Sequence, residues 1–185
     1  MRIWMLFLLI PLLSCTDQPR PAGATIPVEA EAALRQAPSW DLFSLNPYAE
    51  FDESDPETFH GWKVLGSLNI QDDAVRQSLL KTLEESVAAN PGQTAACFMP
   101  RHGIRASYNN QQFDFVICFQ CYHVKWYRDG SQQTGFHPTD TPGPAFNAVL
   151  KQAEVPLPEQ AALRDAQRPS EISSAFTGSK NRPGE

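Results

Sequence analysis

Residues 102–118 read HGIRASYNNQQFDFVIC, and the pair Asn109-Asn110 near the middle of this stretch decides the predicted fold. Asparagine tolerates a positive φ angle, so the pair suits a two-residue turn between antiparallel strands. The turn predicts a hairpin whose strands cover residues 95–107 and 112–127. The second strand is apolar on both faces between residues 113 and 126, which is the pattern of a central strand.

The same turn fixes the register of the hairpin. On one face it places apolar residues opposite one another, in the pairs Ala106–Phe113, Ile104–Phe115, His102–Ile117 and Phe98–Cys121. On the other face it places Arg105 opposite Asp114, which is a favourable cross-strand pair of opposite charges. A slip of one residue would mix the two faces, so the sequence favours this register.

Further elements follow on both sides of the hairpin. Residues 62–70 alternate between inward and outward positions and predict a half-buried strand. After Asp72 the apolar residues recur on one helical stripe, and the Asn-Pro-Gly sequence at residues 90–92 ends this helix. Residues 133–137 predict a short further strand, and residues 144–153 predict a second helix.

These patterns predict an α+β domain over residues 39–157. In it, a small antiparallel sheet of three or four strands carries two helices packed on one face. The apolar segment 40–48 lacks a regular period and is expected to pack onto this domain as an irregular stretch. Residues 15–38 are predicted to be a tether that contains a short helix at its end, and residues 158–185 a disordered polar tail.

The first fourteen residues have the pattern of a secretory signal peptide. A basic start at Arg2 precedes eleven apolar residues, 3–13, which are too few to span a membrane. The sequence Leu12-Leu13-Ser14-Cys15 resembles the lipobox of bacterial lipoproteins, in which the cysteine is acylated and becomes the first mature residue. The alternative is an ordinary signal peptide that has a cysteine at the cleavage site by chance.

The resemblance to lipoproteins implies a location for the protein. Acylation at Cys15 would anchor the chain stably to a membrane, with the domain facing the periplasm. By analogy with lipoprotein sorting, Thr16 after the cysteine favours the outer membrane in a Gram-negative host. The expected location is therefore the cell envelope, with attachment to the membrane through the lipid.

Composition bounds the classes of function. Cleavage before Cys15 leaves 171 residues, which suffice for one domain and its tails. The formal net charge is −6, or −7 once Arg2 is removed, and the chain has no basic stretch. This composition argues against nucleic acid as a partner.

Three cysteines lie within the predicted domain. On a continuous strand, Cys118 and Cys121 would point to opposite faces with Cα atoms roughly 10 Å apart, beyond the reach of a disulfide. A bulge near Pro100 would bring Cys97 opposite Cys121, so the predicted disulfide is Cys97–Cys121 with Cys118 as a free buried thiol. Three buried thiols, or a zinc site that adds His123, remain as alternatives.

The run Arg101-His102-Gly103-Ile104-Arg105 resembles the start of the histidine acid phosphatase signature. That resemblance implies a nucleophilic His102 and phosphate contacts from Arg101 and Arg105. The sequence departs from the pattern at Ser107, where the family has proline, and it lacks the later His-Asp pair. The alternative interpretation makes His102 a hydrogen-bonded core residue and Arg105 the partner of Asp114.

Residues 97–123 also resemble a block found in small uncharacterised bacterial proteins. The resemblance covers CF.PRHGIR and DFVICF.C, about thirty residues, and implies no activity. The candidate ligand-binding residues are Arg101, His102 and Arg105 from the first block, together with Tyr122 and Trp126 further along the hairpin. Aromatic residues at this spacing are more often part of a core than of a binding surface.

The sequence shows no complete catalytic set, and it predicts neither a cofactor nor a metal. The leading hypothesis is a non-enzymatic, membrane-anchored envelope lipoprotein that binds another envelope component or a secreted protein. One alternative is a phosphate-ester hydrolase that uses Arg101, His102 and Arg105. Another is a zinc- or thiol-responsive sensor.

Overall fold

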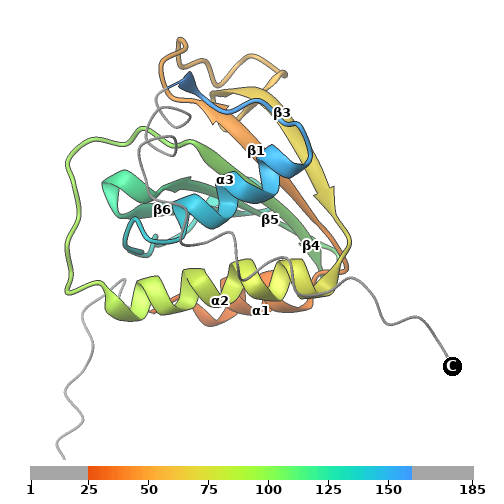
Figure 1. The fold of residues 1–185 in the computed structure, drawn as a ribbon, viewed down its shortest axis with the longest axis vertical. Helices are drawn as coiled ribbons and strands as arrows, with labels where there is room; N and C mark the ends of the chain where they lie inside the picture. The colour runs from red at the N-terminus through yellow and green to blue at the C-terminus, as the bar shows by residue number, and fades with distance from the viewer. Residues whose placement is uncertain (1–24, 160–185) are drawn as a thin grey trace, which may run out of the picture.

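The computed structural model describes residues 25–159. The predicted signal peptide, the lipidation site at Cys15, the first part of the tether and all but two residues of the tail lie outside the described residues. The elements run in the order α1 (Val28–Gln36), β1 (Trp40–Asn46), β2 (Thr58–Phe59), β3 (Trp62–Ile70), α2 (Asp73–Ala89), β4 (His102–Tyr108), β5 (Gln111–Cys118), the 3-10 turn η1 (Phe119–Cys121), β6 (His123–Arg128), β7 (Ser131–Gln132) and α3 (Gly143–Gln152) (Figure 1).

The sheet is larger than the sequence predicted. Within residues 25–159, seven antiparallel strands form one curled sheet in the order β2-β3-β1-β4-β5-β6-β7, and three helices accompany it. The prediction of a small sheet of three or four strands with two helices was therefore wrong, although helices and antiparallel strands do combine in one domain. The additional strands are β1, β6 and the two-residue strands β2 and β7, and the short helix predicted in the tether, α1, packs on the domain as a third helix.

Strand β1 is the longest of the additional strands. The segment that the sequence presented as irregular pairs with β3 on one side and β4 on the other. Trp40 and Leu42 are fully buried beneath the helices, while Phe43 and Leu45 pack on the opposite face of the sheet. A strand that is apolar on both faces shows no alternation, and a bulge between Ser44 and Leu45 breaks its ladder further.

The hairpin forms around the predicted turn, but β4 and β5 are shorter than the predicted strands 95–107 and 112–127, and Phe98 does not pair with Cys121. Strands β4 and β5 pair in the predicted register, with Ile104 opposite Phe115 and Arg105 opposite Asp114. Both turn residues adopt positive φ angles, 50° at Asn109 and 59° at Asn110. The turn chemistry of two asparagines therefore sets the register of the whole central ladder.

All three helices contribute to the main core, which lies on one face of the sheet. The side chain of Asp72 caps α2 by accepting hydrogen bonds from the backbone of Ala74 and Val75. Helix α1 buries Ala33 and Leu34 completely, so this predicted part of the tether belongs to the packed domain. We call this side of the sheet the helix face and the opposite side the reverse face.

The reverse face carries a smaller apolar cluster of its own. Leu45, Phe59 and Val116 are buried there, with other aromatic side chains packed against them. Strand β2 folds back over this face so closely that a Cβ at Gly103 would lie 2.7 Å from the ring of Phe59. The close approach of Phe59 therefore favours glycine at the second position of β4, which is buried.

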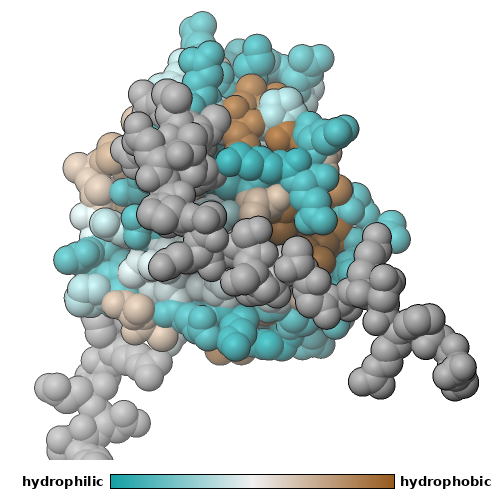
Figure 2. All heavy atoms as spheres, viewed as in Figure 1, coloured by the Kyte–Doolittle hydropathy of each residue, from teal (hydrophilic) through white to brown (hydrophobic). Residues whose placement is uncertain are grey.

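A pocket opens on the helix side, between the end of β3 and α3. Figure 2 shows hydrophobic surface in this region, and Leu68, Val75 and Val149 are among the lining residues. Asp72 is the one ionisable group in the lining, and its carboxylate already caps α2. This pocket offers apolar contacts but no chemistry.

Candidate functional site

Sulfur, aromatic and basic side chains gather at one end of the sheet. The antiparallel ladder brings the last residues of β1 and β5 to the same end of the sheet as the first residues of β3, β4 and β6. Residues 90–101, which join α2 to β4, run along this end of the sheet. Backbone hydrogen bonds connect Arg101 to Leu45 and to Ile117. We call this end of the sheet, which contains Cys97, Cys118 and Cys121, the thiol end.

The structure joins Cys118 to Cys121, so the predicted Cys97–Cys121 disulfide is corrected. Strand β5 stops at Cys118, and the chain turns through η1 with Tyr122 in the left-handed region at φ 52°. The turn brings the Cα atoms of the two cysteines to 5.2 Å, well within the range for a disulfide. The predicted pairing is wrong because the strand does not continue through residues 119–122, as the sequence pattern suggested.

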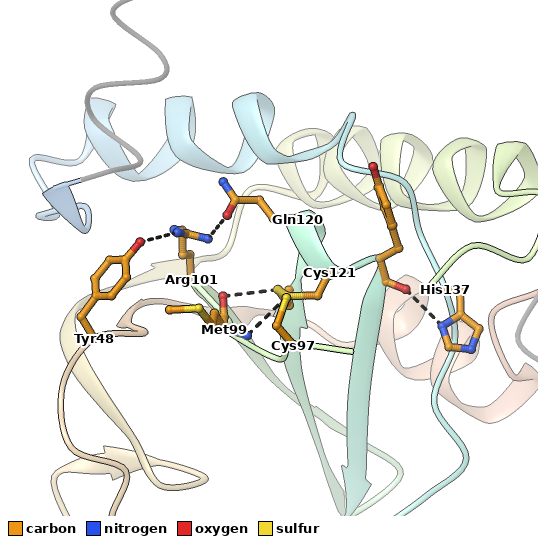
Figure 3. Close-up of a disulfide and its surroundings, with 9 residues drawn as sticks. Tyr48, Cys97, Met99, Arg101, Gln120, Cys121 and His137 are labelled. Carbon is orange, nitrogen blue, oxygen red and sulfur yellow. Dashed lines mark hydrogen bonds between the residues drawn. A yellow bond between two sulfur atoms is a disulfide. The ribbon is translucent and has the colours of Figure 1, made fainter. Parts of the chain in front are cut away.

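Cys97 is the free cysteine of the described chain, and it is exposed to solvent. Its sulfur lies 3.6 Å from the sulfur of Cys121 (Figure 3). Two backbone groups fix this position, because the N–H of Ala95 donates to the carbonyl oxygen of Cys121 and the N–H of Met99 points at its sulfur, 3.4 Å away. Sequence reasoning placed Cys97 beside Cys121 but assigned the bond to the wrong partner.

Arg101 also lies at the thiol end. Its guanidinium donates to the side-chain oxygen of Gln120 and, over 2.8 Å, to the hydroxyl of Tyr48, and it lies 5.8 Å from the Tyr48 ring centre (Figure 3). The Nε of Arg101 is buried and has no hydrogen-bond partner within residues 25–159. Arg101 thus links the loop after β1 to η1 beside the disulfide.

The other residues of the Arg101–Arg105 run point elsewhere. His102 is buried on the helix face, where its Nε2 lies 2.8 Å from Oδ1 of Asn147 in α3. Arg105 lies on the reverse face, where it forms two hydrogen bonds with Asp114, of 2.8 and 2.9 Å. The structure does not bring Arg101, His102 and Arg105 around one point, so they do not form the phosphate site that their sequence resembles.

The two aromatic candidates also lie apart. Trp126 is 3% exposed, packs into the helix-face core and donates its indole N–H to the carbonyl oxygen of Thr134. Tyr122 occupies the left-handed turn after η1, where its carbonyl oxygen lies 3.1 Å from Nδ1 of His137. Trp126 is therefore a core residue, as the alternative interpretation held, and the two rings share no binding surface.

Five other rings form a continuous row along the thiol end. We name Phe51, Trp62, Phe98, His123 and His137 the aromatic row. Successive ring centres are 5.1, 6.1, 5.4 and 5.1 Å apart. Phe51 is 50% exposed, and a lysine ammonium group lies 4.4 Å from the Phe98 ring centre.

Little in the amino-acid sequence indicated this row. Phe51 precedes an acidic stretch that has the composition of a solvated loop, and Phe98 was placed on the helix-face side of the hairpin. In the structure Phe98 instead packs with the reverse-face cluster, because β4 begins only at His102. Only the fold of the two connecting segments brings these rings together.

A buried charge network stabilises the reverse face next to the row. The side chain of Asp114 is 3% exposed and accepts hydrogen bonds from Arg105 and Gln112, while Nε2 of His60 lies 2.9 Å from its Oδ2. The ring of His60 stacks on Tyr127 at 3.8 Å between centres. These contacts provide the hydrogen-bond partners that the buried carboxylate of Asp114 needs.

The network shifts the acidity of its members. Although burial raises the pKa of Asp114, the hydrogen bonds from Arg105 and His60 hold it below its ordinary value.

In the aromatic row, burial lowers the pKa of His123, and the positive charges of His137 and Lys125 lower it further. His123 is therefore a neutral ring at neutral pH.

No family model, curated protein or solved structure matches this chain. The geometry of the thiol end is therefore the basis for assigning a function. Within residues 25–159 no helix is long and apolar enough to cross a membrane. The same residues contain no group of three or more histidine, cysteine, aspartate or glutamate side chains placed to hold a metal ion.

Proposed function

We propose that this protein is an envelope lipoprotein anchored through Cys15, and that its domain is a non-enzymatic module that binds another envelope component. The observation that carries the binding role is the aromatic row. It is a connected set of rings at the thiol end, and it includes Phe51, which is half exposed. The other four rings of the row are partly buried, and aromatic residues are enriched at protein interfaces.

The arrangement of the domain supports a binding role over hydrolysis. A phosphate-ester hydrolase would need His102 to reach its substrate, yet this side chain is 4% exposed and packs beneath α3. Arg105 is engaged by Asp114 on the opposite face. The aromatic row, in contrast, is accessible at Phe51 and needs no chemistry to function.

Substitution of Cys15 tests the proposed lipid anchor. We expect Cys15→Ser to abolish lipid attachment, because serine offers no thiol to acylate. The variant should move from the membrane fraction to the soluble fraction or remain as the uncleaved precursor, as fractionation and mass spectrometry of the N-terminus would show. A wild-type chain that begins elsewhere and carries no lipid would exclude the anchor.

The binding role is tested by removing the exposed ring. We expect Phe51→Ser to reduce the capture of specific envelope proteins at least tenfold, because a central aromatic contact contributes about 2 kcal/mol or more to binding. The measurement is co-purification with the intact lipoprotein from detergent-solubilised envelope, quantified by mass spectrometry.

A matched control is available at the other end of the domain. Val28 on α1 is 83% exposed, so Val28→Ser removes a comparable apolar group away from the row and should leave capture unchanged. If both variants capture the same proteins as the wild type, the aromatic row is not the binding surface.

A second candidate function, a thiol-responsive one, is favoured by the contact between Cys97 and Cys121. The zinc form of this hypothesis is less well supported, because the sulfurs of Cys118 and Cys121 are bonded to each other and do not act as thiolate ligands in that state.

A further inference from the structure

The thiol end combines an exposed thiol with a disulfide that solvent does not reach. Cys118 and Cys121 are each 1% exposed, whereas Cys97 is exposed. An external thiol therefore has no path to either sulfur of the disulfide. It does have access to Cys97, whose sulfur is already in contact with Cys121.

The contact is held on both sides by the backbone. Ala95 is tied to the carbonyl oxygen of Cys121, and Arg101 is tied to the carbonyl oxygen of Ile117, so residues 95–101 cannot drift from η1 without losing both hydrogen bonds. The 3.6 Å between the sulfurs of Cys97 and Cys121 is close to the separation from which a nucleophile attacks. The Met99 N–H lies 3.4 Å from the Cys121 sulfur, where it would stabilise a thiolate on that atom.

We propose that Cys97 is the shuttle thiol of a thiol–disulfide relay, which transfers the oxidation state of the buried Cys118–Cys121 disulfide to an external dithiol. In the first step the Cys97 thiolate attacks the sulfur of Cys121. The Cys97–Cys121 bond forms, the Cys118–Cys121 bond breaks, and the electron pair remains on Cys118, which takes up the proton that Cys97 released.

The second stage takes place at the surface. One thiolate of the external dithiol attacks the sulfur of Cys97, and Cys121 leaves as a thiolate beside the Met99 N–H. The second thiol of the same molecule then attacks the first and releases Cys97. The dithiol is oxidised to a disulfide, Cys118 and Cys121 are reduced to two thiols, and Cys97 returns to its starting state, so atoms and electrons balance.

The exposed position of Cys97 determines which class of substrate can react with it. The molecule must carry two thiols close enough to bond to each other, and it must reach an exposed loop, which fits a small dithiol or a protein with a reduced cysteine pair. The relay depends neither on the lipid anchor nor on the aromatic row. Its failure would therefore leave the proposed binding function standing, and the failure of that function would leave the relay.

The relay is tested by the rate at which the buried disulfide is reduced. The oxidised full-length protein is mixed with dithiothreitol without oxygen, acid-quenched at intervals and alkylated, and mass spectrometry follows the thiols of Cys118 and Cys121. We expect Cys97→Ser to slow the reduction at least about tenfold, because direct access to the disulfide is blocked. Gln93→Ser, at an exposed position of the same segment, should react like the wild type. Equal rates in wild type and Cys97→Ser would overturn the proposal.

A second variant traps the intermediate. In Cys118→Ser the buried disulfide cannot form, so Cys97 and Cys121 are left as neighbouring thiols. Mild oxidation should then join them within one molecule and make the chain two hydrogens lighter. If both thiols of the oxidised, folded variant still react with an alkylating reagent, Cys97 cannot reach Cys121 and the relay is excluded.

Discussion

Replacing Asp114 with asparagine is expected to destabilise the domain by about 3 kcal/mol at neutral pH. The substitution keeps the shape of the side chain but removes the charge that pairs with Arg105 and His60. Breaking a buried ion pair costs about 3–5 kcal/mol, and the partial exposure of Arg105 places this pair at the lower end. Urea unfolding followed by fluorescence measures the change.

The neighbouring strand provides a control. Asp41 lies opposite Arg105 in the ladder, and its carboxylate accepts a hydrogen bond from Asn69 at the surface. Asp41→Asn should therefore cost less than about 1 kcal/mol. If Asp114→Asn costs no more than Asp41→Asn, the network on the reverse face does not stabilise the fold.

The effect of Asp114 also depends on pH. Because the folded-state pKa of Asp114 lies below its ordinary value of 3.8, its contribution is present above the unfolded-state pKa and is lost as the pH falls through the folded-state pKa. The difference in unfolding free energy between wild type and Asp114→Asn should accordingly be full near neutrality and shrink below about pH 4. A difference that is constant from neutral to acidic pH would contradict the charge as its cause.

Replacing Trp40 with alanine is expected to destabilise the domain by about 3–5 kcal/mol. Trp40 is fully buried at the start of β1, and its indole N–H donates to the carbonyl oxygen of Leu34 in α1. The variant would leave a cavity between the sheet and this helix and an unpaired carbonyl oxygen. Thermal and urea unfolding would measure the loss.

Trp40→Phe separates the two contributions. The phenyl ring fills most of the space and removes the hydrogen bond, so we expect a loss of about 1–2 kcal/mol. The result also tests the place of β1 in the sheet. If Trp40→Ala cost less than about 1 kcal/mol, this segment would be a peripheral flap, as its irregular pattern suggested, rather than a central strand.

The sequence predicted the elements whose signals are local. The two asparagines at residues 109 and 110 set the hairpin register, alternation predicted β3, and a helical stripe after Asp72 predicted α2. Each of these signals arises within a short stretch of chain. None of them required knowledge of what packs above or below the sheet.

The sequence was less successful with the candidate site. It drew attention to Cys97 and Arg101, which do lie at the thiol end, and to His102 and Arg105, which point to opposite faces of the sheet. Strand alternation already separates neighbouring residues of the run, so resemblance to a loop motif could not hold once the run formed part of a strand.

What the sequence determined by itself is the central hairpin, because turn conformation and side-chain alternation are properties of neighbouring residues. What only the tertiary structure decided is the insertion of β1 between β3 and β4, the pairing of Cys118 with Cys121, and the assembly of the aromatic row. These features depend on where strands stop and which segments cross their ends. Those choices follow from burial against residues far away in the chain, and no local pattern encodes them.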